Sequence, residues 1–430
     1  MQWDAEDPTH RARHRDAELR GYLRGDLGRF SPFYRRHFKE CGVDPIRIRG
    51  LSDLGRVRPV AWDQIAEAPE ALVVTPTRRD LARHGEKRLV LAMLSAWVTR
   101  RLDRVNRTMV EPRYKPLLWT THDGVPIGNT STDLELVARA GSRALAVAGL
   151  DRTDLVVGLT ESASGLPHWQ LVLGGREGGV AAVHLGAAAD PESVVRAGPT
   201  ALAGPPDVLL RVLAGASERG LRLDGVRTLL VTGVDPDAAL RDALMLASLA
   251  VLDAPPAVVA SWAPPGVRAQ WAECREGAGF HTFPDLEIVE VGRGGGLHSS
   301  GPGLLVWSGL GWRGSAFFRL LTGKRAEVVD GTCEACGRRG PMVITGSRSG
   351  LGALEILGGR DDVSAFQIEL SERDGREELV VFLALARGAD LIDVLDDIDV
   401  SLDATQYVVL SRPQVESRIR RDGARAVVRS

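Results

Sequence analysis

The chain has 430 residues, and its 54 lysines and arginines against 56 aspartates and glutamates leave a net charge of −2. This near-neutral balance argues against a nucleic-acid partner held by bulk charge, and the most apolar window, residues 243–252, is much shorter than the ~20 residues of a membrane span. Four cysteines and a highly charged N-terminus predict neither a disulfide scaffold nor a secretory signal, so we expect a cytoplasmic protein with no membrane and no nucleic-acid partner.

The first predicted elements in chain order are two helices, at residues 17–30 and 32–41, where apolar residues recur at helical spacing. From about residue 117, short apolar runs alternate with helix-length segments. The runs that read as strands are residues 154–159, 179–185 and 226–233. Strands separated by helices are typical of parallel pairing with crossover helices, so this part of the chain predicts an α/β layered fold.

Past residue 283 the pattern changes to strands joined by glycine-rich links, at residues 286–291, 304–307 and 326–329. A stretch rich in Gly and Ser, residues 345–359, predicts a domain boundary. Beyond it, two alternating runs flank Asp374-Gly375, a hairpin turn signal. The elements expected there are strands at 365–370, 377–385 and 406–410 and a helix at 389–398. We therefore predict a large N-terminal α/β domain, residues 1–348, and a small α+β domain, residues 349–430.

Three of the four cysteines and one histidine have the spacing of a metal site. Cys274 and His281 are seven positions apart, and Cys333 and Cys336 form a Cys-x-x-Cys pair. A Cys3His set is a tetrahedral zinc shell with no open position for catalysis, so we predict structural zinc. Two interpretations stay open: buried free thiols beside an unrelated histidine, and a redox pair, although no thioredoxin-like pattern surrounds it. Cys41 reads as a lone buried thiol.

The segment 31–64 resembles the N-terminal signature of phenylacetate–CoA ligases, which belong to the adenylate-forming superfamily of acyl-CoA synthetases. Further segments resemble, in order, the phosphate loop, the Tyr-Gly-x-Thr-Glu turn, the Arg-x-Arg-Thr-Gly-Asp element, the interdomain hinge and the last conserved turn of that family. These segments are residues 119–130, 261–274, 319–324, 357–363 and 421–428. The resemblance implies the adenylate-forming two-domain fold. It also implies a reaction in which ATP, with Mg²⁺, adenylates a carboxylate. The acyl group of that adenylate is then transferred to coenzyme A.

The resemblance assigns a nucleotide site to five residues of this chain. Thr120, Thr121 and Gly124 fall in the phosphate loop, Trp262 is placed to stack on a purine, and Arg319 begins the nucleotide-contacting element. Each assignment has an ordinary alternative. The loop also reads as a surface turn, Trp262 as core packing, and the end of the Arg319 element as a solvated loop.

One residue, His168, falls where the family lines its acyl pocket. It is the only histidine that the sequence suggests as an acid or base. A structural histidine with satisfied hydrogen bonds is the alternative interpretation.

Each catalytic motif departs from the family pattern. The phosphate loop lacks a lysine and carries Asp123, which would repel a triphosphate, and the turn lacks the glutamate that holds Mg²⁺. Lys324 replaces the aspartate that accepts the ribose hydroxyls, and an ammonium group cannot accept hydrogen bonds. The chain has only four lysines, Lys324 being the last, so the small-domain catalytic lysine is missing too and its place falls at Ala424. Losing one preorganised electrostatic group lowers a rate ~10²–10³-fold.

We therefore interpret the protein as a pseudo-ligase that binds a small acyl or aryl ligand or a protein partner and has lost ATP-dependent activation. The alternative is an active, divergent AMP-forming acyl- or aryl-acid ligase, for which ATP, Mg²⁺ and coenzyme A would be cofactors. A third hypothesis is acyl transfer from a pre-activated substrate. The observation that separates them is the space between the two domains, because an open pocket favours a ligand and a filled one favours a scaffold.

Overall fold

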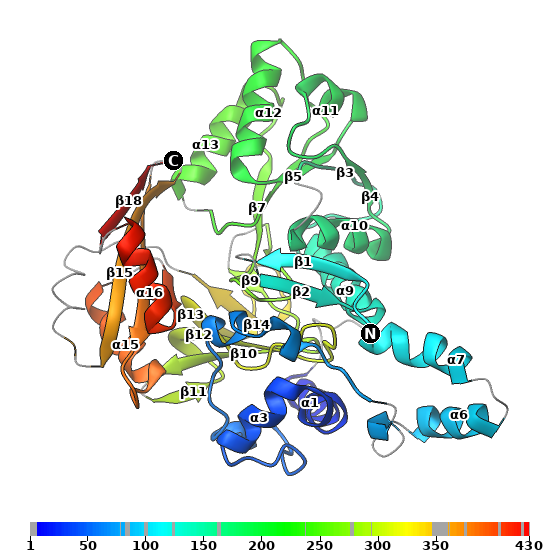
Figure 1. Ribbon diagram of the computed structural model, residues 1–430. Helices are drawn as coiled ribbons and strands as arrows, with labels where there is room; N and C mark the ends of the chain where they lie inside the picture. The colour runs from blue at the N-terminus through cyan, green and yellow to red at the C-terminus, as the bar shows by residue number, and fades with distance from the viewer. Residues whose placement is uncertain are drawn as a thin grey trace.

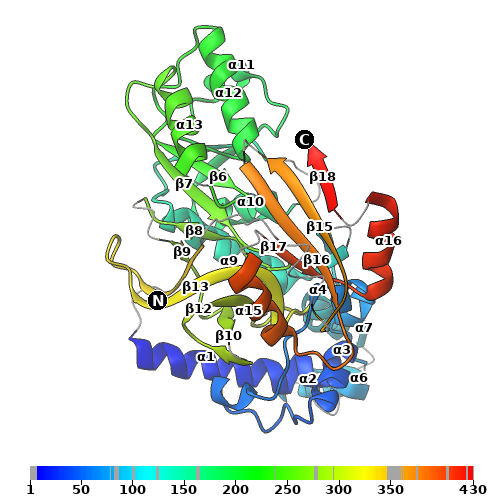
Figure 2. The ribbon, with the colours of Figure 1, turned by 90° about the vertical axis from the view of Figure 1, so that its left-hand side faces the viewer.

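The computed structural model describes residues 7–77, 79–81, 87–98, 102–122, 125–160, 165–236, 238–275, 279–293, 295–345, 360, 362–373, 376–402, 406–422 and 425–429. Figure 1 shows three regions: N-terminal helices at the bottom, a layer of parallel strands and helices at the top, and a C-terminal unit at the left. One long sheet, with strands from residues 155–344, runs from the layer at the top down to the N-terminal helices. Figure 2 shows the C-terminal strands lying across the face of that sheet.

The N-terminal region is helical, and both helices predicted there are confirmed. The helices up to residue 114 are α1 (Pro8–Tyr22), α2 (Gly28–Phe30), α3 (Pro32–Glu40), α4 (Trp62–Ala66), α6 (Lys87–Val98), α7 (Leu102–Val105) and α8 (Glu111–Tyr114). The break between the two predicted helices follows from Ser31, whose hydroxyl accepts the N–H of Tyr34 at 3.3 Å and caps α3. Pro32 then occupies the first helical position, where its missing N–H has no effect.

Five parallel strands confirm the predicted α/β layering. They are β3 (Leu155–Gly158), β4 (Ala181–His184), β5 (Ala201–Gly204), β6 (Thr228–Thr232) and β7 (Ala257–Trp262). The helices that accompany them are α9 (Ser131–Val147), α10 (Leu166–Gly178), α11 (Pro191–Ala197), α12 (Pro206–Glu218) and α13 (Ala238–Leu249). In the spatial order β4-β3-β5-β6-β7, the chain adds β4 on one side of β3 and then β5 on the other side, so the order in which strands are added reverses between β3 and β5. Such a reversal opens a crevice at the carboxyl ends of the strands, where open α/β sheets bind ligands.

An antiparallel half continues the same twelve-stranded sheet. Its strands are β8 (Trp271–Glu273), β9 (Phe280–His281), β10 (Glu287–Arg293), β11 (Gly296–His298), β12 (Gly301–Gly309), β13 (Leu320–Thr332) and β14 (Arg339–Ile344). Three of them, β10, β12 and β13, confirm the strands predicted past residue 283. A separate hairpin is formed by β1 (Leu118–His122) and β2 (Val125–Asn129).

The C-terminal unit has its own four-stranded sheet, of order β17-β16-β15-β18. Its elements are β15 (Val363–Arg373), β16 (Arg376–Leu385), α15 (Leu391–Leu402), β17 (Gln406–Val409), α16 (Arg412–Asp422) and β18 (Arg425–Arg429). The predicted α+β unit is thus confirmed. Arg373 pairs with Arg376, so β15 and β16 form a hairpin at the predicted place. Residues 374 and 375, and the predicted boundary at 348/349, lie outside the described residues.

The C-terminal unit shares a hydrophobic core with the large sheet. Leu304 and Leu321, from β12 and β13, pack in one cluster with Leu383, Ile398 and Tyr407, and each of these five residues is at most 4% exposed. Burying one such side chain contributes about 1.5–3 kcal/mol, so the shared core holds the C-terminal unit against β12 and β13. Among the described residues, no helix has the length and apolar character that crossing a bilayer requires.

Candidate functional site

The predicted phosphate-loop residues lie on the β1–β2 hairpin. Thr120 is buried, whereas the next residue, Thr121, is exposed. Successive side chains of a strand point to opposite faces, so the two threonines do not face a common ligand. Gly124 lies outside the described residues. His122, the last residue of β1, makes an edge-on contact with the indole of Trp62, with 5.2 Å between ring centroids.

Trp262 ends β7 at the carboxyl edge of the parallel strands, but its side chain packs into the protein. The residue is 7% exposed and belongs to the main hydrophobic core. Its ring lies 5.3 Å from that of Phe280 and meets that of Trp271 edge-on at 6.2 Å. A purine could stack on Trp262 only by displacing one of these rings, so the geometry agrees with the packing interpretation.

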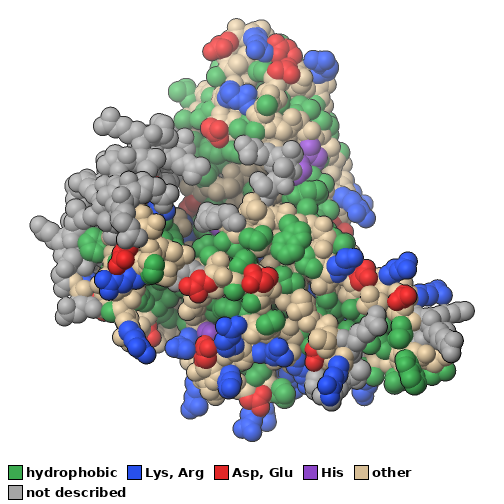
Figure 3. Space-filling model, in the orientation of Figure 1, with side chains coloured by type: hydrophobic (Ala, Val, Ile, Leu, Met, Phe, Trp, Pro, Cys, Tyr) green, Lys and Arg blue, Asp and Glu red, His purple; other side chains and the backbone are tan. Residues whose placement is uncertain are grey.

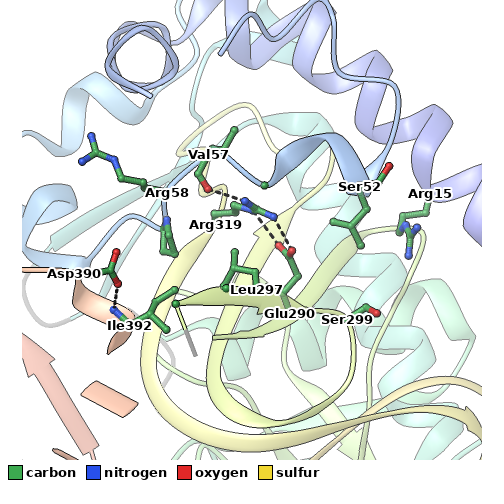
Figure 4. A pocket seen from close by; sticks show the side chains of 15 residues that line it. Arg15, Ser52, Val57, Arg58, Glu290, Leu297, Ser299, Arg319, Asp390 and Ile392 are labelled. Carbon is green, nitrogen blue, oxygen red and sulfur yellow. Dashed lines mark hydrogen bonds and ion pairs between the residues drawn. The ribbon is translucent and has the colours of Figure 1, made fainter. Parts of the chain in front are cut away.

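Arg319 directs its guanidinium group into the interior. Its Nη2 and Nε donate to the two carboxylate oxygens of Glu290 at 2.7 and 3.1 Å, and its Nη1 donates to the carbonyl of Val57 at 2.6 Å (Figure 4). The same Nη1 also donates to the carbonyl of Leu54 at 2.5 Å. Arg319 is 3% exposed and has a φ of +52°, which is uncommon outside glycine. Four of its five N–H donors thus fasten the N-terminal segment to β10.

A cavity of about 440 Å³ opens beside this ion pair (Figure 4). Its walls come from α1, the segment 51–59, the β10–β11 hairpin and the start of α15. Its volume is typical of small-molecule sites. The charged or hydroxyl-bearing side chains that line it, apart from the ion pair, are Arg15, Ser52, Arg58, Ser299 and Asp390. Apolar surface comes from Leu51, Val57, Pro59, Leu297 and Ile392, so the walls of this cavity are mixed.

The element 319–324 ends where β17 packs against β13. Gly323 has a φ of +71°, and a Cβ at this position would overlap the carbonyl oxygen of Tyr407 in β17. The neighbouring hydroxyl of Thr322 donates to the carbonyl of Leu305 at 2.9 Å. The backbones of the two regions therefore touch at Gly323, at the place where the resemblance puts ribose contacts.

The space left between β13 and β17 is small. The cavity there has a volume of about 30 Å³, which is enough for water but far below the roughly 300 Å³ of a small-molecule pocket. Its lining residues are Ala61, Trp62, Pro265, Leu321, Thr322, Gly323, Gln406, Tyr407, Val408 and Val409. Among the described residues, the seam between β13 and β17 is thus nearly filled, whereas the cavity of about 440 Å³ beside Arg319 also lies between the two regions, because Asp390 and Ile392 of the C-terminal unit line it.

His168 lies in the first turn of α10, beside the point where the sheet order reverses. Its Nδ1 is 3.3 Å from the hydroxyl of Thr160, which follows β3, and its ring centroid is 5.3 Å from that of His184, which ends β4. Burial lowers the pKa of His168, and burial together with the charge of His168 lowers the pKa of His184. Both imidazoles are therefore neutral at neutral pH. Each can then donate or accept a proton at the carboxyl edge of the parallel strands.

Sequence reasoning missed two buried carboxylates of the large sheet. Glu273 accepts Nη2 of Arg241 with both oxygens at 2.8 Å, and one of these oxygens also accepts the N–H of Ala260 at 3.0 Å. Glu290 pairs with Arg319 as described above. An acidic residue inside an otherwise apolar strand could have predicted a buried ion pair, because a buried charge requires a partner. The sequence could not say which arginine supplies it.

A third buried carboxylate, Glu287, lies between two indole rings. Its oxygens accept the N–H groups of Trp271 and Trp307 at 2.7 and 2.6 Å and the backbone N–H of Phe283 at 2.7 Å. Burial raises the pKa of Glu287 to about 7, although these three donors favour the ionised form. Its hydrogen bonds join β10 to β12, its neighbour in the sheet, and to β8, which lies further along the strand order.

The four predicted metal ligands come together. Cys274 follows β8, His281 lies in β9, and Cys333 and Cys336 lie in the turn from β13 to β14. Their ligand atoms all lie within 4.8 Å of one another, and Nε2 of His281 is 3.5 Å from Sγ of Cys336. The turn is closed by the N–H of Gly337, which donates to the carbonyl of Cys333 at 2.8 Å. A Cys3His cluster of this size can hold a metal ion.

No protein-family model matches the sequence, and no curated protein matches it significantly. Solved structures of a 2-hydroxyisobutyryl-CoA ligase match nearly the whole chain. Its complex with 2-HIB-AMP and CoA in the thioesterification state has a TM-score of 0.65 at 17% identity over 100% of this chain and 91% of that one. Its postadenylation-state complex with R3-HIB-AMP has a TM-score of 0.64 at 16% identity over 95% and 88% of the two chains.

An open conformation of the same ligase has a TM-score of 0.62 at 16% identity, over 95% of this chain and 90% of that one. At such identities the likeness concerns the fold, and the phenylacetate–CoA ligase subtype stays a prediction. The matches cover both the large sheet and the C-terminal unit. The protein therefore has the two-domain α/β fold of the adenylate-forming acyl-CoA ligases.

Proposed function

We propose that this protein is a pseudo-ligase, in which the adenylate-forming fold serves a binding or regulatory role without ATP-dependent acyl activation. The observation that carries the proposal is the filled seam between β13 and β17. A cavity of about 30 Å³ at this place leaves no room for a nucleotide. A filled seam at the place of the ribose contacts favours a scaffold, while the cavity of about 440 Å³ beside Arg319 leaves open space elsewhere between the two regions.

The side chains assigned to the nucleotide also support this proposal. Arg319 spends its donors on Glu290 and on two backbone carbonyls, and Trp262 packs against two aromatic rings. Lys324 stands where an acceptor for the ribose is needed, and the sequence has no later lysine. Several independent losses at one site are expected to abolish a reaction that depends on all of them together.

The alternative, an active but divergent acyl- or aryl-acid ligase, is favoured by one observation. Thr160, His168 and His184 gather at the carboxyl edge of β3 and β4, where open α/β sheets bind ligands. In that case His168 lines the substrate pocket, and ATP, Mg²⁺ and coenzyme A act as cofactors. The small ligand of the pseudo-ligase, an acyl or aryl group, would occupy the same crevice.

Nucleotide binding separates the two proposals. Isothermal calorimetry with Mg²⁺-ATP and pyrophosphate release with a panel of aromatic and fatty acids should both give no signal. AMP or pyrophosphate formation with any acid would overturn the pseudo-ligase. Heat of ATP binding without product formation would refute the filled nucleotide site and leave only the loss of catalysis standing. Loss of that heat in His168→Ala, with unchanged thermal unfolding, would assign the ligand to the crevice at β3 and β4.

We further propose that the Cys3His cluster binds structural zinc. Four protein ligands fill a tetrahedral shell, and Cys274, His281 and Cys333 are buried at the junction of β8, β9 and β14. Elemental analysis should find about one zinc per chain, and a value well below one would overturn the assignment. The four cysteines form no disulfides, which supports a reducing compartment such as the cytoplasm. The separate C-terminal sheet supports two domains, 1–348 and 349–430.

A further inference from the structure

Helix α6 exposes a row of large apolar side chains. Leu91, Leu94, Trp97 and Val98 are 65%, 57%, 71% and 75% exposed. Residues three and four positions apart lie on one face of a helix, so these four side chains form a single stripe, which we call the α6 face. Figure 1 shows α6 on an arm that projects from the lower right of the molecule, and Figure 3 shows hydrophobic side chains gathered at the end of that arm.

The other face of α6 is already buried by the chain itself. Leu89 is 2% exposed, and Met93 packs against the main hydrophobic core. Between Leu89 and Val98 the only polar residue is Ser95. A helix that is apolar on all sides is normally covered on all sides, yet this helix is covered on one. Residues 89–98 therefore have the composition of a buried helix, although one face of the helix is exposed.

The α6 face is the main apolar surface among the described residues. Of the ten large hydrophobic residues that are strongly exposed, four lie on α6. The other exposed ones include two pairs, one in or beside β1 and one on α13. These are Leu117 with Trp119 and Leu246 with Leu249. Contiguous exposed apolar surface of this kind marks an interaction site.

The composition of α6 indicates which kind of surface can cover the α6 face. Helices that lie on a membrane surface have a strongly charged face and low net hydrophobicity, whereas residues 89–98 carry no charge. The only charges of α6 are Lys87 and Arg88 at its first turn, so the helix lacks a charged face along its length, and an apolar protein surface fits it better than a membrane does. An α6 face from a second copy of this chain has this character. Homodimers are usually two-fold symmetric, with the same patch on both sides, and their interfaces resemble a domain core cut in half.

The charges at the ends of α6 favour an antiparallel arrangement. Exposed Lys87 begins the helix, and exposed Asp103 follows its last residue by five positions, in α7, which packs against α6. An antiparallel pair of α6 helices centred near Ser95 brings each Lys87 toward the Asp103 of the other copy. It also places Leu91 opposite Val98, and the small Ser95 at the centre lets the two helices approach closely.

We propose that the protein forms a two-fold symmetric dimer through the α6 face, with α6 packed antiparallel on α6 of a second copy. This surface does not depend on the proposed loss of catalysis, since α6 contributes no residue to the seam or to the histidine crevice.

Sedimentation velocity over a range of concentrations tests the dimer. The wild type should sediment as a dimer at micromolar concentration, and Leu94→Glu should raise the dimer dissociation constant about 100-fold or more, because it places an unpaired charge in the interface. Leu94 is exposed in the single chain, so the variant should keep the wild-type circular dichroism and melting temperature. Leu246→Glu, at a leucine of α13 that is 73% exposed against 57% for Leu94, is the control and should stay dimeric.

Cross-linking tests the orientation. In Ser95→Cys, the two introduced thiols should lie near the symmetry axis and form an intermolecular disulfide on mild oxidation, whereas Leu246→Cys should not. A wild type that is monomeric at all concentrations would overturn the proposal. So would an unchanged dimer in Leu94→Glu, equal cross-linking of both cysteine variants, or a monomer that binds anionic phospholipid vesicles through α6.

Discussion

Replacing Arg319 by methionine should be among the most destabilising single changes in this protein. The substitution keeps an unbranched side chain of similar length and keeps the strained φ of +52°, so the difference from the wild type reports the guanidinium group. It leaves the carboxylate of Glu290, a residue that is 3% exposed, without its partner, and it removes the donors of two backbone carbonyls. Removing one partner of a buried ion pair costs about 3–5 kcal/mol.

The double variant Arg319→Met/Glu290→Met separates the ion pair from packing. Replacing both members of a buried pair by apolar groups is often nearly neutral, although the carbonyls of Leu54 and Val57 still lose their donors. We therefore expect the double variant to be more stable than the Arg319 single variant. The two losses should fall short of additivity by about 2 kcal/mol or more.

Urea unfolding at constant pH measures these differences. Arg219→Met is the matched control, because Arg219 pairs with Glu192 on the surface and their side chains are 49% and 45% exposed; it should cost less than about 1 kcal/mol. A loss for Arg319→Met as small as that of the control would refute the structural role. So would stabilisation by Mg²⁺-ATP of the wild type but not of the variant, since that would make Arg319 a nucleotide ligand.

Three further changes test other parts of the structure. Cys333→Ser should lower the melting temperature and abolish its sensitivity to EDTA, because structural zinc contributes to folding free energy; Cys41→Ser should do neither, and equal melting temperatures would contradict the zinc site. The pKa of Glu287 rises from 4.5 in the unfolded chain to about 7. Its proton therefore stabilises the fold fully below pH 4.5, and about 3 kcal/mol is lost as the pH rises to 7. Glu287→Gln should lack this slope in urea unfolding at pH 5 and 8, and parallel pH curves would refute the assignment. Gly323→Ala would place a methyl group against the carbonyl of β17 and should speed hydrogen exchange of β17 about tenfold or more, whereas Gly331→Ala in the same strand meets open space; equal exchange in the two variants would show that the seam does not depend on this contact.

Local patterns were sufficient to predict the layered fold. Apolar runs of strand length separated by helix-length segments predicted the parallel half of the sheet, because a crossover helix is the usual way to join parallel strands. Asp374-Gly375 between two alternating runs predicted the hairpin of the C-terminal unit, since such a dipeptide fits a two-residue turn. What these patterns left open was the path of β8 and β9: β8 pairs with β7, and β9 pairs with β8 and β14, which makes one continuous sheet.

The sequence by itself also determined which chemistry is missing. Lysine appears four times and never after Lys324, so the composition alone excludes a catalytic lysine from the C-terminal unit. The spacing of Cys274, His281, Cys333 and Cys336 identified a candidate metal cluster in the same way. Both conclusions follow from residue identity and position along the chain, and neither needs to know how distant segments approach each other.

Only the tertiary structure decided how the remaining candidates are used. It packs Trp262 against two aromatic rings, directs Arg319 to a glutamate of another strand and closes the seam at Gly323. The physical reason is that burial and hydrogen-bond partners depend on contacts between residues far apart in the chain, and periodicity carries no information about them. The same limit applies to α6, whose apolar sequence reads as interior while its fold leaves one face uncovered.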